Sequence, residues 1–294
     1  MDKREVLIVH LGGLGDVCLS ESVFYSLRTH FDDNLTGLGN KRFLGLFQEY
    51  FDKTEGIESR KWLYLFSEKL GGPFWKQIVF IGKDTHGILR KRWQQFSGER
   101  LIFIDMYQEG TYGEASSDPI HQKQVRERLH IEDYQLLQLK ENGIQPLKKA
   151  IIEKKAARVI LYPERGFTKE KWPPDKFLEL HRSLEKRGID VTVQQPLGLV
   201  FDVGRKVSYE DLAEVKQFYS EGGVFVSNDS GMAHLAGACG LFTITIFTDF
   251  DPHIWRPRGQ NSTITQENGS LEASTVEKSV LEVLSRSGVG VNGS

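Results

Sequence analysis

The chain has 294 residues and a formal net charge of −2; 39% of its residues are hydrophobic and 27% are charged. This balance is typical of a globular protein and excludes a disordered chain, while the length suits two α/β domains of ordinary size. A net charge near zero gives no support to nucleic-acid binding, so an anionic partner would have to be bound by a local basic patch.

Cysteine content and apolar runs indicate the compartment. The two cysteines, Cys18 and Cys239, are too few for a disulfide framework, and we expect small buried side chains in a reducing environment. No apolar run approaches the roughly 20 residues of a membrane span, and no signal peptide is visible. We therefore expect a cytoplasmic protein without a transmembrane segment, able to work peripherally at the inner face of a membrane.

The N-terminal half begins with a strand, a glycine turn and a helix. The apolar run 6–10 ends at Gly12-Gly13-Leu14-Gly15, which is typical of a buried parallel strand. A helix should follow, because apolar side chains recur on one helical face at Leu19, Val23, Phe24 and Leu27. This is the first unit of a Rossmann-like sheet. Further strands are predicted at 78–81 and 101–104, and a polar helix from Pro119 to about Leu129.

The same pattern starts again after a lysine-rich segment at 147–155, which we predict to be the interdomain linker. Strands are expected at 159–162, 190–193, 198–203, 224–226 and 243–247. Helices are expected from 174 to a cap at Gly188, at 209–219, at 231–239 and around 276–284. The predicted fold class is α/β, with domains at 1–148 and 149–294 and a cleft between them.

The turn Gly12–Asp16 is the first candidate site. Glycines let backbone approach a ligand, and a helix N-terminus attracts negative charge. The turn is not G-x-G-x-x-G, and an acid stands where a pyrophosphate would lie, which disfavours a nicotinamide-dependent oxidoreductase. Asp16 either caps the helix, which is the simpler interpretation, or accepts a proton from a substrate hydroxyl.

The segment 227–234 is the second candidate. The helix starting near Gly231, with Ser230, offers N–H groups for a diphosphate. Asp229 is suited to sugar hydroxyls and His234 to a phosphate oxygen, but an N-cap followed by a buried histidine fits the spacing equally well. Lys171, in the loop after strand 159–162, could neutralise phosphate or simply be solvated. No pattern of metal ligands is visible.

In this order the segments resemble glycosyltransferase family 9, the bacterial lipopolysaccharide heptosyltransferases. The resemblance is strongest from 224 to 257 and thin between 32 and 119. It departs from the family at Ser20-Glu21-Ser22, Tyr162-Pro163-Glu164-Arg165 and Phe247-Thr248. The matching motifs are Leu14-Gly15-Asp16-Val17, Leu27-Arg28, Lys171-Trp172-Pro173, Lys206-Val207-Ser208-Tyr209, Asn228-Asp229-Ser230-Gly231 with His234-Leu235-Ala236, and Phe247 with Asp251-Pro252, Trp255 and Pro257.

The resemblance implies a GT-B fold, with two facing Rossmann-like domains and a cleft between them. It implies an inverting, metal-independent transferase that uses ADP-heptose as substrate, needs no cofactor and modifies the lipopolysaccharide inner core. Asp16 would be the general base and Asp229 would hold the donor sugar. The implied diphosphate-binding residues are Thr168, Lys171, Ser230, Gly231 and His234.

The implied partners are a nucleotide-sugar donor and an anionic glycolipid acceptor at the inner membrane, and no nucleic acid. Charge alone suggests that basic residues of the first domain contact the acceptor, although a solvated face is the simpler interpretation. These residues are Arg60, Lys61, Arg90, Lys91 and Arg92. The departures leave open a family-9-like transferase with another donor or acceptor, and a nucleotide-sugar-binding protein without turnover.

Overall fold

The computed structural model describes residues 5–108, 128–164, 171–196, 198, 201–266 and 270–288. These residues form two compact units. The first comprises 5–108 and 128–149, and the second begins at Ala150. Each is described by itself below.

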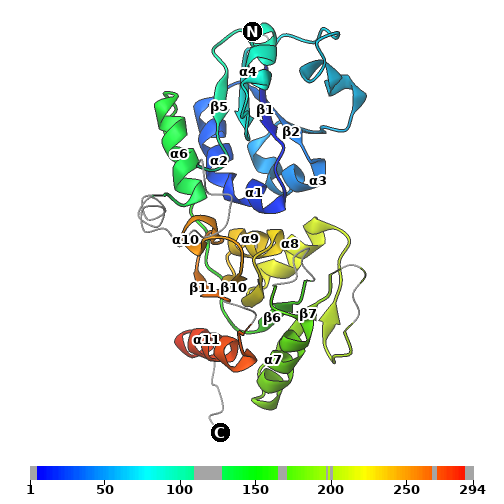
Figure 1. The fold of residues 1–294 in the computed structure, drawn as a ribbon, viewed down its shortest axis with the longest axis vertical. Coiled ribbons are helices and arrows are strands. Elements are labelled where there is room, and N and C mark those ends of the chain that lie inside the picture. The colour runs from blue at the N-terminus through cyan, green and yellow to red at the C-terminus, as the bar shows by residue number, and fades with distance from the viewer. Residues whose placement is uncertain are drawn as a thin grey trace. The chain divides into compact units, whose positions relative to one another are not determined.

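The first unit is a parallel sheet with helices packed against it (Figure 1). Its strand order is β3-β2-β1-β4-β5, and every pairing is parallel. The strands are β1 Glu5–His10, β2 Asn34–Gly39, β3 Lys53–Gly56, β4 Gln77–Ile81 and β5 Ile102–Ile104. The helices are α1 Leu14–Leu19, α2 Glu21–His30, α3 Lys41–Leu44, α4 Ile88–Trp93 and α6 Ile131–Glu141, with 3-10 turns η1 Gly45–Tyr50, η2 Arg60–Leu65 and η3 Gln94–Phe96.

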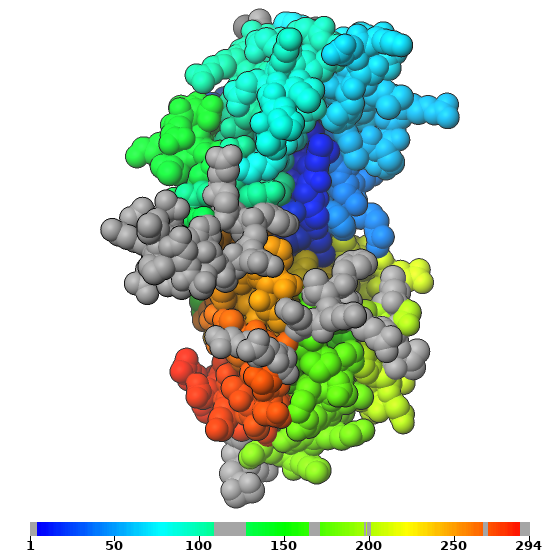
Figure 2. Space-filling view, viewed as in Figure 1, coloured from blue at the N-terminus to red at the C-terminus, as the bar shows by residue number. Residues whose placement is uncertain are grey.

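The second unit repeats this architecture with six strands. Its order is β11-β10-β9-β6-β7-β8, again parallel throughout. The strands are β6 Val159–Tyr162, β7 Val191–Gln194, β8 Lys206–Val207, β9 Val224–Asn228, β10 Phe242–Phe247 and β11 Asn261–Thr265. The helices are α7 Pro174–Lys186, α8 Leu212–Ser220, α9 Gly231–Ala238, α10 Pro252–Trp255 and α11 Ala273–Arg286. Helices α7 and α11 lie side by side (Figures 1 and 2) and are joined by Arg187 and Ser183 to Glu277.

Both sheets have the strand order of a Rossmann fold. In each, the first strand is central, two strands follow on one side, and the chain then crosses to the other side. The order therefore reverses between β1 and β4 in the first unit and between β6 and β9 in the second. Ligands of open α/β sheets bind at the carboxyl ends of the strands beside such a reversal. The predicted α/β class with two Rossmann-like domains is confirmed.

Several predicted elements differ in detail. The first predicted helix is two helices, α1 and α2, which meet at Ser20. The predicted strand 198–203 is not a strand at 198 or 201–203; Phe201 is buried in the core of the second unit, and β8 follows at Lys206–Val207. Helix α8 starts later than expected, where the Asp211 carboxylate accepts from Ala213 N at 2.9 Å. Residues 119–127 of another predicted helix lie outside the described residues, while 128–130 are not helical.

Several elements were not predicted, among them β2 and α6. The sequence of β2, Asn-Leu-Thr-Gly-Leu-Gly, lacks the continuous apolar run that marks the other central strands. Its last glycine is required by packing: a Cβ on Gly39 would lie 2.1 Å from the carbonyl oxygen of His10. Within the described part of the chain, no helix has both the length and the apolar character of a membrane span.

Candidate functional site

The candidate donor site lies where β9 passes into α9, beside the reversal of the second sheet. Strand β9 is buried along its whole length and ends at Asn228. Ser230, whose backbone is extended, is the N-cap of α9, which starts at Gly231. The Ser230 hydroxyl accepts from Ala233 N at 3.3 Å and caps the helix. Helix geometry leaves the N–H groups of Gly231 and Met232 without intrahelical acceptors. Backbone donors and the positive end of the helix dipole therefore occupy the ligand-binding edge of this sheet.

Lys171 is brought to the same edge by a buried amide. The Asn228 side chain is 1% exposed; its oxygen accepts from Trp172 N at 3.0 Å and its nitrogen donates to Trp172 O at 3.1 Å. This double hydrogen bond fastens the loop after β6 to the end of β9. As a result, the Lys171 ammonium donates to the carbonyl oxygen of Asp229 at 3.0 Å. The predicted residues Lys171, Asp229, Ser230 and Gly231 are thus gathered in one place.

His234 lies one turn into α9 and is 6% exposed. Its Nε2 is 3.7 Å from Asp229 Oδ1, an ion-pair distance when the ring is protonated. Its Nδ1 is buried and has no hydrogen-bond partner among the described residues. The structural alternative for this segment, an N-cap followed by a buried histidine, is therefore present. A buried nitrogen without a partner is costly, and a ligand acceptor would satisfy it.

Glu164 joins this cluster and was not predicted as a site residue. It is the second residue after β6, at the reversal of the sheet. Burial is the main cause that raises the pKa of its carboxyl; nearby Lys171 lowers that pKa and Asp229 raises it. The sequence marked Glu164 only as a departure from the family pattern. The signal that could have found it is its place immediately after the first strand of a Rossmann unit.

In the first unit, Asp16 occupies the first turn of α1 after β1. Its Oδ2 accepts from Gly13 N at 2.8 Å, so it does cap the helix, while its side chain remains partly exposed. The approach of backbone to side chain is tight: a Cβ on Gly12 would lie 2.6 Å from Asp16 Cβ and 2.7 Å from Met106 Cε. Capping does not exclude general-base catalysis, because a carboxylate accepts several hydrogen bonds.

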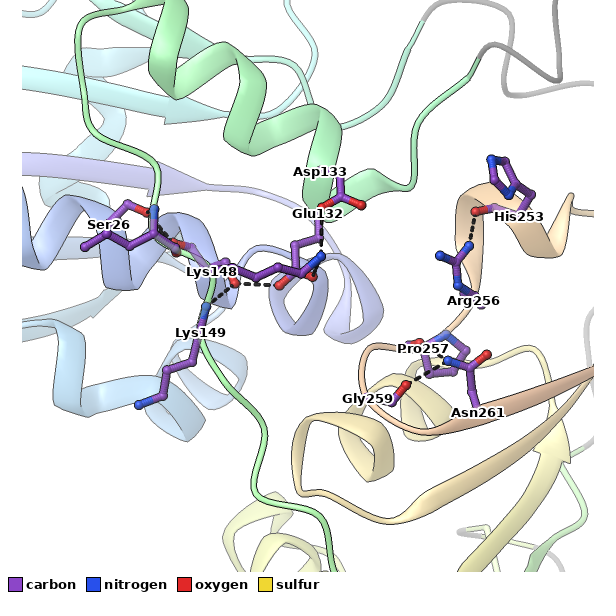
Figure 3. A network of polar contacts seen from close by, with 12 residues as sticks. Ser26, Glu132, Asp133, Lys148, Lys149, His253, Arg256, Pro257, Gly259 and Asn261 are labelled. Atoms are coloured by element: carbon purple, nitrogen blue, oxygen red, sulfur yellow. Dashed lines mark hydrogen bonds and ion pairs between the residues drawn. The ribbon is translucent and has the colours of Figure 1, made fainter. Parts of the chain in front are cut away.

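Ser22 lies where the sequence departs from the family pattern, and its hydrogen bonds hold the last residues of the first unit, near Lys149, against α2 and α6. Its hydroxyl donates to the Glu132 carboxylate and accepts from Lys149 N at 2.9 Å. Lys148 Nζ is 2.8 Å from Asp133 and 3.3 Å from Glu132 (Figure 3). Ser26 adds a two-way hydrogen bond to the backbone of residue 147. The departure therefore has a structural reason that is independent of substrate.

The basic residues predicted to contact an acceptor are separate side chains with different surroundings. The Arg92 guanidinium donates to the carbonyl oxygens of Tyr64, Ser67 and Leu70, a structural role in holding that segment. Arg90 lies over the Phe103 ring at 4.2 Å, and Lys61 pairs with Glu55 at 2.7 Å. Arg60 and Lys91 are exposed. Their role toward an acceptor stays a prediction, as does that of Thr168, which lies outside the described residues.

The segment after β10 contains the one-turn helix α10. Asp251 caps α10 by accepting from His253 N at 2.8 Å. Arg256 donates to the carbonyl oxygen of His253, and Asn261 Nδ2 donates to Gly259 O at 2.9 Å (Figure 3). Arg258 O packs against α9, where a Cβ on Gly237 would approach it to 2.4 Å. The loop therefore supports the helix of the candidate donor site. No group of three potential metal ligands occurs among the residues described.

Solved structures share this fold over nearly the whole chain. A glycosyltransferase family 9 protein from Veillonella parvula DSM 2008 matches with a TM-score of 0.71 at 12% identity, covering 97% of this chain and 99% of that one. E. coli ADP-heptose lipopolysaccharide heptosyltransferase II matches with 0.66 at 12% identity, covering 96% and 99%. E. coli heptosyltransferase WaaC, solved with ADP, matches with 0.63 at 16% identity, covering 95% and 99%. The architecture is that of GT-B glycosyltransferases.

The family model of "Glycosyltransferase family 9 (heptosyltransferase)" matches residues 209–284. This match agrees with the resemblance found in the sequence motifs, and the chain shares its fold with the family 9 structures named above. The matched segment contains Asp229, Ser230, Gly231 and His234 but neither Asp16 nor Lys171. No curated protein matches the chain in a sequence search.

Proposed function

We propose that the protein transfers heptose from ADP-heptose to an anionic glycolipid acceptor of the lipopolysaccharide inner core, with inversion and with Asp16 as general base. The observation that carries the donor assignment is the gathering of Lys171, Asp229 and the N-terminus of α9 at the reversal of the second sheet. A diphosphate needs cations and backbone N–H donors, and this edge supplies both.

In this proposal, each candidate site residue of the second unit has its own role in binding the donor. Lys171 and the first N–H groups of α9 hold the diphosphate and stabilise the charge that develops on the leaving ADP. His234, with its unpartnered Nδ1, donates to a phosphate oxygen, and Asp229 holds sugar hydroxyls. Structures similar in fold were solved with ADP and with ADP-2-deoxy-2-fluoro heptose, which supports an adenine-nucleotide donor. We further propose that the protein works in the cytoplasm, at the inner membrane.

The donor is tested by thermal-shift measurements with a panel of nucleotide sugars and free nucleotides. We expect ADP and ADP-heptose to raise the melting temperature, because binding to the native state stabilises it by RT ln(1 + [L]/Kd). UDP- and GDP-sugars serve as controls. Stabilisation by a UDP-sugar and none by ADP would reject the proposed donor and favour a related transferase with another donor.

The base is tested with Asp16→Asn, which keeps an acceptor for Gly13 N–H but cannot take up a proton. We expect kcat to fall about 10²- to 10⁴-fold, the usual contribution of general-base catalysis, while donor binding is retained. Release of ADP in the presence of lipopolysaccharide acceptor extract is the measurement. Wild-type turnover by Asp16→Asn would reject the mechanism. No acceptor-dependent release by the wild-type protein would favour the binding protein without turnover.

A further inference from the structure

His10 is a buried titratable side chain to which the proposed reaction gives no role. It ends β1, the central strand of the first sheet, and is 0% exposed. Its ring meets Phe24 of α2 edge-on, with centroids 5.7 Å apart. A polar side chain in such a place is expected to have all its hydrogen bonds formed, and those bonds show what it holds.

The hydrogen bonds of His10 define its tautomer. The Gly12 N–H is a donor only and lies 3.2 Å from His10 Nδ1, so Nδ1 is the acceptor and carries no proton. In the neutral ring the proton is then on Nε2, which donates to the Ser20 hydroxyl at 3.1 Å. Burial agrees with this, because it lowers the pKa of His10 to about 4 and keeps the ring neutral at pH 7.

Two hydrogen-bond partners of His10 stand on either side of Asp16, and the backbone of Asp16 itself also hydrogen-bonds the ring. Gly12 begins the turn before α1, and Ser20 is the residue at which α1 gives way to α2. Within that segment the Asp16 carboxylate is fastened to Gly13 N, and Gly12 is packed against both Asp16 and Met106. Met106 is itself held, since its carbonyl oxygen accepts from Gln135 of α6 at 3.2 Å. The ring of His10 therefore ties together both ends of the segment that carries Asp16.

We propose that His10, as the neutral Nε2-protonated tautomer, is the positioning residue that fixes the segment from Gly12 to Ser20 and so places the Asp16 carboxylate for transfer. The inference rests on the proposed role of Asp16 as general base. Reacting groups must be held within a fraction of an ångström, and a misplacement of about 1 Å costs about 10²-fold in rate. A histidine that merely fills the core would be replaceable by an apolar side chain without such a loss.

The test uses two substitutions in the full-length protein. His10→Leu removes the hydrogen bonds to Gly12 and Ser20, whereas His10→Asn places an acceptor near the position of Nδ1 and keeps the bond to Gly12. We expect His10→Leu to lower kcat about 10²-fold with the KM for the donor unchanged, because the donor site is in the second unit. His10→Asn should recover about tenfold of that loss. His181→Leu, at a buried histidine of α7 outside the site, is the matched control and should keep kcat.

A measurement on the unmodified protein keeps the test decisive if His10→Leu does not fold. The ¹⁵N chemical shifts of the His10 ring should show an unprotonated Nδ1 and a protonated Nε2 at pH 7. The opposite tautomer, or wild-type kcat in a folded His10→Leu, would overturn the inference. Failure of the proposed function is distinguishable: wild-type turnover by Asp16→Asn would reject Asp16 as base, whereas the ¹⁵N shifts of the His10 ring would be unaffected by that result.

Discussion

At the scale of single residues, the candidate donor site combines charges of both signs within a small cluster. Lys171 is held against the backbone of Asp229, and Glu164 stands beside both. A diphosphate entering this cluster gains from the ammonium and is repelled by two carboxylates. Asp229 has a proposed use in binding sugar hydroxyls, whereas Glu164 replaces a neutral glycine-type position of the family pattern. Glu164 is therefore expected to weaken diphosphate binding whenever it is ionised.

Removal of the Glu164 charge should tighten nucleotide binding. We expect Glu164→Gln to bind ADP about three- to tenfold more tightly at pH 7, as judged from the magnitude of a partly screened charge pair. Because burial raises the pKa of Glu164, lowering the pH toward that pKa should also strengthen ADP binding by the wild-type protein relative to the variant. Titration calorimetry at pH 5 and 7 measures both. Equal affinities of the two proteins at both pH values would contradict the prediction.

The buried His10 should make stability depend on pH. Its folded-state pKa of about 4 lies below the ordinary value of 6.5, so the unfolded chain binds a proton first as the pH falls. The contribution of the neutral ring is complete above pH 6.5 and is lost between pH 6.5 and about 4, by on the order of 3 kcal/mol. Urea unfolding of wild type and His10→Asn at pH 4, 5 and 7 checks this. The variant should lose less stability on acidification.

At the scale of elements, the packing of α9 depends on its small residues and on the glycine that follows its carboxyl end. The sequence Gly-Met-Ala-His-Leu-Ala-Gly-Ala lets the helix pack closely, and Gly237 approaches Arg258 O. The helix ends at Ala238 with Cys239 as its C-cap, and Gly240 follows with a φ of 89° that only glycine adopts readily. A Cβ on Gly240 would also lie 2.0 Å from Ile152 O. The position of α9, the helix of the candidate donor site, therefore depends on the glycine that follows it.

Two helix-ending glycines allow a matched comparison. Gly188, after α7, has a φ of 75° with open space around it, whereas Gly240 has both a positive φ and a close neighbour. We expect Gly188→Ala to lower the free energy of unfolding by about 1 kcal/mol and Gly240→Ala by about 3 kcal/mol or more. Urea unfolding measures both variants. Equal losses would show that the contact with Ile152 relaxes without cost.

At the scale of the whole molecule, the two units share one strand order but differ in the charged groups that follow their central strands. In the first unit, the carboxylate of Asp16 follows the first strand. In the second unit, Lys171 lies in the loop after the first strand and contacts the backbone just before α9. The chain between them is anchored to the first unit at Lys149 N by Ser22 and to the second at Lys154 N, which donates to Gly240 O at 2.8 Å. Only residues 150–153 separate these two anchors.

Ligand binding should therefore protect backbone amides from hydrogen exchange in one unit more than in the other. We expect ADP alone to slow amide hydrogen exchange in the second unit, in peptides covering 224–240 and 171–173, because all proposed diphosphate contacts lie there. Exchange at 12–20 should be unchanged by ADP alone. Hydrogen exchange with mass spectrometry, with UDP as the control, measures this. Protection confined to 12–20 would place the nucleotide on the first unit and contradict the proposal.

Much of the fold was predictable because central parallel strands are apolar runs ended by glycine or polar turns. Strands β1, β4, β6, β9 and β10 were predicted on that ground. Strand β2 was not, since its glycines break the apolar pattern; of these, Gly39 is needed where β2 passes the backbone of His10. Of the site, Asp16 and the segment after β9 were found from motifs, but Glu164 was not, because its importance depends on a neighbouring loop.

The sequence alone thus determined the α/β class, the two strand-turn-helix beginnings and the family resemblance, because these depend on local periodicity and short motifs. Only the tertiary structure decided the strand order, the contact of Lys171 with Asp229 and the tautomer of His10. Each of these depends on groups that are distant in sequence or on which partner meets which nitrogen. Such contacts are set by packing of whole elements and not by the composition of any single segment.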